Sequence, residues 1–246
     1  MRPSHCFRVL PLLVCCSLYP AFALAAPESL TPIPLAALKE QARKRQGEPA
    51  RVALAAKDAE IFRGAEPLNY LGASEPPNYL RALAVLPNAV KPSSELLSAA
   101  LYAGQLEPEV KMAMGLRMAQ LNNSPYVAAH MGRLLRASPR GQKLLAQLEA
   151  ADAKAWAPPD ALALEYADSL TRNVNGVSDA AFQKVSAVYN DSQLVEMTMT
   201  VSFFNYFTRM AEALRLPVES WAFDAPQGSP APNRFAPPPA RVALIS

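Results

Sequence analysis

Residues 106–130 read LEPEVKMAMGLRMAQLNNSPYVAAH, two apolar segments with helical spacing that are joined by a short polar turn. Pro108 opens the first predicted helix, which runs to about Leu121. Ser124 is a residue type favoured at the N-cap, and the proline that follows it suits the first position of a helix. The second predicted helix therefore begins there and runs to Ala137.

Outward from this pair, the sequence is typical of helices almost throughout. Proline and Ser-Pro pairs divide it, and runs with period-two alternation are absent apart from RVALIS at the end. The stretch 64–79 holds three prolines and two glycines and predicts a loop. The further predicted helices cover 33–45, 50–63, 78–86, 92–104, 138–151, 160–172, 179–189 and 192–215. The fold class is therefore all-α, a helical bundle with a proline-rich C-terminal tail.

The last of these helices, with Asp191 expected as its cap, is the longest. Its middle reads MTMTVSFFNYF and is apolar almost all round. Such a pattern predicts a buried central helix.

The first 25 residues have the pattern of a secretory signal peptide. Arg2 and Arg8 precede an uncharged run, 9–25, that ends in Ala-Leu-Ala. A membrane anchor is the alternative, but the run is at the short edge for spanning a bilayer and two prolines interrupt it. We therefore expect an exported protein, periplasmic or extracellular, without a stable membrane anchor after cleavage.

All three cysteines, Cys6, Cys15 and Cys16, fall inside this predicted signal. The mature chain would then have no disulfide, no thiolate nucleophile and no cysteine metal ligand. We divide the remainder into a helical N-terminal extension over 26–79, a principal domain over 80–223 and a proline-rich tail over 224–246.

Charge and ligand spacing exclude several classes of function. The formal net charge is +3, and the longest basic cluster, Arg43-Lys44-Arg45, is most simply a solvated helix face, so no nucleic-acid footprint is evident. One histidine without acids at ligand spacing predicts no metal site. No glycine-rich phosphate loop occurs, and no cofactor is expected. Glu165 and Asp168 are expected on an exposed polar face.

His130 is the single histidine outside the predicted signal. Tyr126 lies four residues before it and shares its helix face, so the two could form a polar pair. His130 is either a catalyst or a satisfied core residue. Ser124 is either a nucleophile or simply the helix cap. In the last helix, Asn205 and Arg209 form either a structural or subunit contact, or an anion clamp that faces His130 in an oligomer.

Three segments of the chain resemble the carboxymuconolactone decarboxylase family, in its alkylhydroperoxidase D-like branch. They are the opening stretch, ALALEYADSLTRNVNGVSDAAFQKV over 161–185, and QLVEMTMTVSFFNYFTRMAEALRLP over 193–217. The resemblance extends from about Leu80 to Glu219 and implies an all-α fold that assembles as trimers or higher homo-oligomers.

The family's redox members use a glutamate, a Cys-x-x-Cys pair and a histidine. By resemblance, the glutamate position falls on Met112 and the first cysteine on Ser124, while the second falls on Tyr126 or Val127. Only the histidine is kept, as His130. A serine hydroxyl cannot form the sulfenic acid or disulfide of a thiol peroxidase, so that chemistry is expected to be absent.

Two functional hypotheses follow. In the first, the chain is a catalytically silent relative that binds a small molecule, and the methionines near the former site, Met112 among them, line an adaptable apolar pocket. In the second, it is an acid–base enzyme of the decarboxylase or lyase type, acting on a small lactone or carboxylate. His130 would then transfer the proton, Tyr126 would orient it, and Arg209 would bind the carboxylate.

Overall fold

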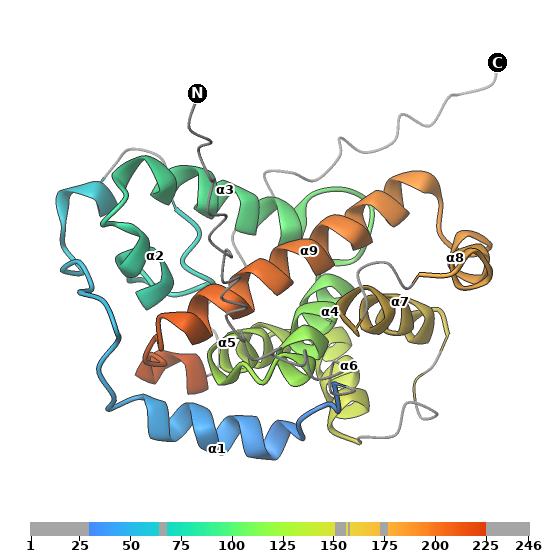
Figure 1. The fold of residues 1–246 in the computed structure, drawn as a ribbon, viewed down its shortest axis with the longest axis horizontal. Coiled ribbons are helices and arrows are strands. Elements are labelled where there is room, and N and C mark those ends of the chain that lie inside the picture. Colours follow the sequence, from blue (N-terminus) through green and yellow to red (C-terminus); the bar gives the residue numbers. More distant parts are fainter. Residues whose placement is uncertain (1–29, 64–67, 151–155, 157, 173–176, 225–246) are drawn as a thin grey trace, which may run out of the picture.

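The computed structural model describes residues 30–63, 68–150, 156, 158–172 and 177–224. Within them the chain forms nine α-helices and two short 3-10 turns, and no strand (Figure 1). The α-helices are α1 (Leu35–Arg45), α2 (Asn78–Leu83), α3 (Pro87–Tyr102), α4 (Pro108–Leu121), α5 (Pro125–Leu135), α6 (Pro139–Glu149), α7 (Asp160–Arg172), α8 (Asp179–Ser186) and α9 (Asp191–Ala213). The 3-10 turns are η1 (Glu60–Phe62) and η3 (Ser220–Phe223). The predicted all-α class is confirmed.

The helix pair of the opening stretch forms as predicted, as α4 and α5. Pro108 and Pro125 each occupy the first turn of their helix, and the Ser124 hydroxyl accepts from the backbone N–H of Val127. Asn123 between them adopts φ of 50°, the left-handed conformation that asparagine tolerates better than most residues. The polar turn thus reverses the chain and packs α5 against α4.

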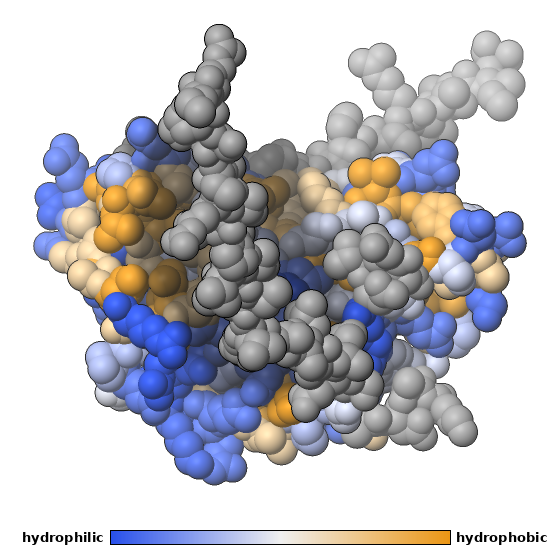
Figure 2. Space-filling view, in the orientation of Figure 1, coloured by the Kyte–Doolittle hydropathy of each residue, from blue (hydrophilic) through white to orange (hydrophobic). Residues whose placement is uncertain are grey.

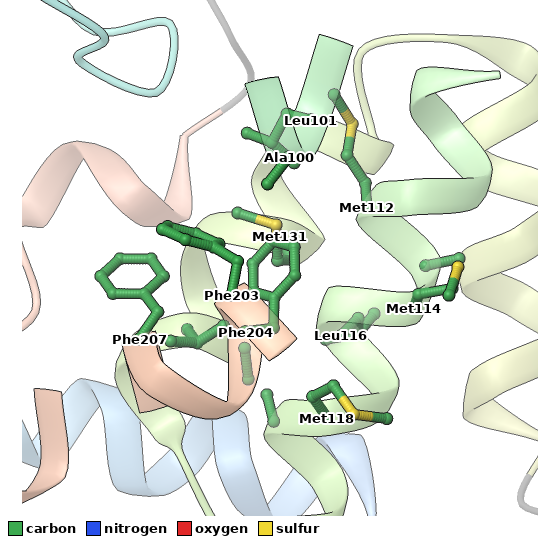
Figure 3. Packing of buried hydrophobic residues seen from close by; sticks show 14 of the residues in the cluster. Ala100, Leu101, Met112, Met114, Leu116, Met118, Met131, Phe203, Phe204 and Phe207 are labelled. Carbon is green, nitrogen blue, oxygen red and sulfur yellow. The ribbon is translucent and has the colours of Figure 1, made fainter. Parts of the chain in front are cut away.

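Helix α4 is the centre of the bundle. Every residue from Val110 to Leu121 is buried, and the helix contacts α5, α6, α7 and α9. Figure 3 shows its methionines and leucine beside three phenylalanines of α9 and a methionine of α5. Gly115 lets α9 approach closely, because a Cβ placed there would lie 2.6 Å from the Phe204 ring.

Helix α9 differs from its prediction as an all-round buried helix. It crosses the front of the molecule in Figure 1 with one face on the core, and Val195, Tyr206 and Arg209 on its other face are exposed. The composition of its middle was misleading because Ser202 and Tyr206 lie on the solvent side, although Met197 and Thr200 are buried. Its cap is Asn190, in a capping box with Gln193, and not Asp191.

Two other predicted features differ, and a third group is untested. The helix predicted over 50–63 is wrong, since only η1 forms there and Ala55 hydrogen-bonds Arg81 of α2 instead. The helix predicted from residue 92 begins at Pro87 and contains Pro92, whose missing N–H removes one bond without ending the helix. The predicted signal peptide, the tail from 225 and the RVALIS segment lie outside the described residues.

Candidate functional site

Ser124 is buried at the start of α5, with no exposed surface. Its hydroxyl caps the helix and donates to Glu212 Oε1 at 2.7 Å. Glu212 in turn pairs with Arg45 of α1 at 2.5 Å. The hydroxyl is therefore tied into a chain of contacts that joins α1, α5 and α9, and it makes no contact with His130 among the described residues.

His130 lies one turn further along the same helix than Tyr126 and is also fully buried. Its ring packs 4.6 Å from the Tyr126 ring and 5.1 Å from the Trp221 ring, centroid to centroid. Its Nε2 is 2.9 Å from Glu219 Oε2, which is ion-pair distance, although the atoms are not aligned for a regular hydrogen bond. Nδ1 has no hydrogen-bond partner in the described part of the chain.

Glu219 is the residue that organises this cluster. It follows α9 by a short turn, and its Oε1 accepts from the Tyr126 hydroxyl at 2.9 Å and from the backbone N–H of Asn78. The Tyr126 oxygen itself accepts from the backbone N–H of Tyr79 at 3.1 Å. The carboxylate thus joins the chain after α9 to α2 and to α5.

These contacts determine the ionisation states of Glu219 and Tyr126. Burial alone would raise the pKa of Glu219, but electrostatic attraction to His130 and the hydrogen bonds that Glu219 accepts hold that pKa below its ordinary value. Burial, and next the negative charge of Glu219, raise the pKa of Tyr126 well above its ordinary value. Glu219 is therefore a carboxylate and Tyr126 a protonated donor at neutral pH.

The segment that carries Glu219 is fastened at a second point. Trp221 donates from its indole Nε1 to Glu75 at 3.0 Å, and Glu75 also accepts from Lys57. The guanidinium of Arg133 lies 5.2 Å from the Trp221 ring and donates to the carbonyl of Leu71 at 2.9 Å. Residues 217–223 thus form a strap that covers His130.

A cavity of about 270 Å³ lies on the outer side of this strap. Its walls come from α2, from the loop before η1 and from the strap, and include Leu54, Lys57, Glu75, Asn78, Arg81 and Glu219. His130 does not line it. Glu219 therefore lies between the His130 ring and this cavity.

A second, apolar hollow of about 490 Å³ lies between α8 and α9. Phe182, Leu194, Val195 and Met199 line it, and Figure 2 shows apolar surface over this part of the molecule. No group of three metal-ligating side chains occurs among the described residues. A search of the same residues finds no helix with the length and hydrophobicity needed to cross a bilayer.

The candidate residues predicted from sequence divide into two groups. Ser124, Tyr126 and His130 lie together at the start of α5, with Tyr126 and His130 packed as a pair. Met112 is 5% exposed and fills the core instead of a pocket (Figure 3).

Arg209 is exposed and donates to Asn205 one turn earlier in α9, at 2.9 Å. Asn205 also bonds to Asn122 and Thr171. Neither Asn205 nor Arg209 bonds to His130 within the described chain. Helix α9 turns Arg209 to solvent, so the subunit contact and the anion clamp both stay predictions.

The sequence did not predict that three further residues belong to this cluster: Glu219, Asn78 and Trp221. The one available signal was a lone acid beside a tryptophan in LPVESWAF, just after the last helix. Asn78 acts through its backbone N–H and a bond from its amide to the Pro217 carbonyl at 2.9 Å, which no residue pattern encodes.

No family model matches the sequence, and no curated protein matches it significantly. Solved structures do. An uncharacterised peroxidase-related protein from Ralstonia eutropha JMP134, described as an alkylhydroperoxidase AhpD core, matches with a TM-score of 0.56 at 20% identity, over 84% of this chain and 100% of that one. A peroxidase-related protein from Silicibacter sp. TM1040 matches with a TM-score of 0.57 at 18% identity, over 72% and 97%.

The debrominase Bmp8 is a third match. Its cysteine-to-alanine variant in complex with 2,3,4-tribromopyrrole has a TM-score of 0.59 at 14% identity, over 71% of this chain and 96% of that one. Identities this low establish the fold alone. The resemblance seen in the sequence is confirmed at that level: the chain has the alkylhydroperoxidase D-like fold.

Proposed function

We propose that this chain is an exported small-molecule-binding protein that has kept the alkylhydroperoxidase D-like fold without thiol peroxidase chemistry. The observation that carries the proposal is the Ser124 hydroxyl, buried and bonded to Glu212 at 2.7 Å in the place of the family's first thiol. Peroxide reduction of this type needs a thiolate to attack and a second thiol to resolve the product. No cysteine occurs after Cys16.

The closed surroundings of His130 support binding over turnover. A general acid or base must come within hydrogen-bond reach of its substrate, and His130 has no exposed surface. The cavity of about 270 Å³ beyond Glu219 is open to small molecules and has both polar and apolar walls. We therefore place the ligand there.

A thermal-shift screen of small molecules on residues 26–246 tests the proposal. Compounds that bind in the cavity should stabilise the wild type, and Leu54→Trp, which fills the cavity, should abolish the shift. Val195→Trp, in the hollow between α8 and α9, is the matched control and should leave it intact. Peroxide consumption with dithiothreitol should equal the rate without protein. Two results would contradict the proposal. One is turnover of peroxide by the protein, and the other is a screen in which Leu54→Trp removes the thermal shift of no compound.

A second candidate is an acid–base enzyme, favoured by the 2.9 Å contact between His130 and Glu219. A carboxylate beside an imidazole can hold the ring in a fixed orientation, which suits proton transfer. Compounds found in the screen would be followed by chromatography for conversion. The enzyme hypothesis requires that His130→Asn abolish conversion without loss of binding, and it fails if the variant converts the compound at the wild-type rate.

Export and assembly complete the proposal. The first 25 residues support cleavage before Ala26, which N-terminal sequencing of protein secreted by a bacterial host would test. The homo-oligomer expected from the resemblance would be tested by light scattering on the purified mature chain. A monomer at all concentrations would remove that part of the proposal alone.

A further inference from the structure

The charged groups around the cavity beside Glu219 differ in how they are neutralised. Glu75 accepts from Lys57 Nζ through both oxygens, at 2.7 and 2.8 Å, and from the Trp221 indole. Glu219 accepts from Asn78 and Tyr126 and lies against His130. Glu75 therefore has its counter-ion without an occupant, and Glu219 has two donors on Oε1, whereas its buried Oε2 makes no regular hydrogen bond.

Arg81 is the exception. It is partly buried in the cavity wall, and its guanidinium donates only to neutral oxygens, from Nε to the Ala55 carbonyl and from Nη1 to Asn78 Oδ1, both at 2.6 Å. No carboxylate of the described chain lies within 4 Å of it, and its Nη2 makes no hydrogen bond there. A partly buried cation without a counter-ion favours an anionic partner.

The two existing bonds also orient Arg81. They fix the plane of the guanidinium group and leave the N–H donors of Nη2 and one N–H of Nη1 as the free part of its fork. Such a fork matches the two oxygens of a carboxylate better than a single point charge does. The Lys57 ammonium on the same wall is paired with Glu75, which leaves Arg81 as the cation of the cavity without a carboxylate partner in the described chain.

The other residues that line the cavity limit the size and polarity of the group that can carry the carboxylate. Leu54, Pro217 and Val218 give the cavity apolar sides, and about 270 Å³ is at the small end of ligand pockets. An alkyl or aryl group of a few carbons would fit beside them. Larger acids would reach past the cavity into solvent.

We propose that this cavity binds small monocarboxylates with short apolar substituents and that Arg81 holds the carboxylate. This rests on the proposed function and names its ligand class. The inference does not require His130 to act as a catalyst. It also explains why a cation is kept in a wall where both nearby acids are already paired.

The test is calorimetric titration of the mature protein with acetate, butyrate and benzoate, and with the three matching amides. Each carboxylate that binds should bind about ten-fold or more tightly than its amide, because a charge-assisted hydrogen bond is lost with the charge. Arg81→Gln should lower the affinity for the tightest-binding carboxylate by a similar factor. Arg51→Gln is the matched control, since Arg51 is exposed and donates only to the Ala213 carbonyl.

A second variant keeps the test decisive if Arg81→Gln does not fold. Leu54→Asp removes no bond and places a carboxylate in the cavity, so it should abolish carboxylate binding. If each amide binds as tightly as its acid, or if Leu54→Asp binds benzoate like the wild type, the ligand class is wrong and the binding function stands. The proposed function fails as well if Leu54→Trp does not remove the binding of any probe or any screened compound.

Discussion

Glu219 Oε2 lies 2.9 Å from His130 Nε2, and both side chains are buried, at 6% and 0% exposure. The two residues are far apart in the sequence, one on α5 and one just beyond α9. The contact therefore ties the last described segment to the centre of the bundle. It also makes the stability of the fold depend on pH.

The first prediction concerns this pH dependence. Because the pKa of Glu219 is lowered in the folded state, its contribution to stability is complete above the unfolded pKa of about 4.3 and is lost as pH falls through the folded pKa. Glu219→Gln should lower the free energy of unfolding at pH 7 by about 1–3 kcal/mol, because a buried charge-assisted contact is removed. Urea denaturation at pH 7, 5 and 3 measures it.

The matched control is Glu165→Gln, since Glu165 is exposed on α7. It should leave the unfolding free energy unchanged at every pH. The difference between wild type and Glu219→Gln should shrink below pH 4. A difference that stays constant from pH 7 to acid would mean that the charge of Glu219 does not contribute.

The second prediction compares two glycines on neighbouring helices. At Gly115 an added Cβ would lie 2.6 Å from the Phe204 ring, whereas at Gly132 the nearest atom is the mobile end of Arg136 at 3.5 Å. Gly115→Ala should destabilise by about 1–3 kcal/mol through overpacking. Gly132→Ala should instead stabilise by roughly 0.5–1 kcal/mol through helix propensity.

Thermal and urea unfolding of both variants measure the two effects. The double variant Gly115→Ala with Phe204→Leu should lose less unfolding free energy than the two single variants together, because the smaller side chain at 204 relieves the clash. Equal effects of alanine at the two glycines would show that close packing of α4 against α9 does not govern stability.

The helices could be predicted where local signals agree. Pro108, Ser124 and Ser138 each combine a cap or a first-turn proline with a following apolar pattern, and α4, α5 and α6 begin there. The prediction failed at residues 50–63, where a helix-like composition is overridden by the Ala55–Arg81 bonds to α2. No periodic pattern of residues in the sequence marks a tertiary contact of this kind.

The candidate site was predictable only in part, for a similar reason. His130 and Tyr126 are four apart on one helix, so their pairing follows from spacing. Asp168 was expected on an exposed face but pairs with Arg117 of α4 at 2.6 Å. Glu219 likewise meets His130 only because the chain turns back after α9. A single sequence gives no information about such long-range partners.

The third prediction concerns the buried pair between Lys111 and Glu196. Their charged atoms are 3.0 Å apart, and Lys111 has no exposed side-chain surface. Glu196 also accepts from the backbone N–H groups of Gln105 and Leu106, at 2.7 and 2.9 Å. Gly104 makes room for it, with φ of 91° and an added Cβ that would lie 2.1 Å from the carboxyl.

Lys111→Met should destabilise by about 3–5 kcal/mol, because it leaves a buried carboxylate without its cation. Glu196→Gln should lower stability by itself, but the double variant should lose less than the two single losses together, since neither charge then remains. A double-mutant cycle by chemical denaturation measures the coupling. Additive losses would mean that the ion pair contributes nothing beyond its separate hydrogen bonds.

The fourth prediction returns a thiol to the position of the family's first cysteine. In Ser124→Cys the sulfur would be buried and would face Glu212, 2.7 Å from the present hydroxyl. A buried thiol beside a carboxylate resists ionisation, so its thiolate fraction at pH 7.5 should be small. The variant should therefore consume no hydrogen peroxide above background, and iodoacetamide should label it about 100-fold more slowly than an exposed thiol.

Ser220→Cys is the matched control for Ser124→Cys, because Ser220 is exposed on the strap. Its thiol should be labelled at the rate of a free cysteine. Adding Glu212→Gln to Ser124→Cys should raise the labelling rate if the carboxylate suppresses the thiolate, and leave it unchanged if burial alone does so. Rapid labelling of Ser124→Cys by itself, or measurable peroxide turnover, would show that this position activates a sulfur and would contradict the prediction.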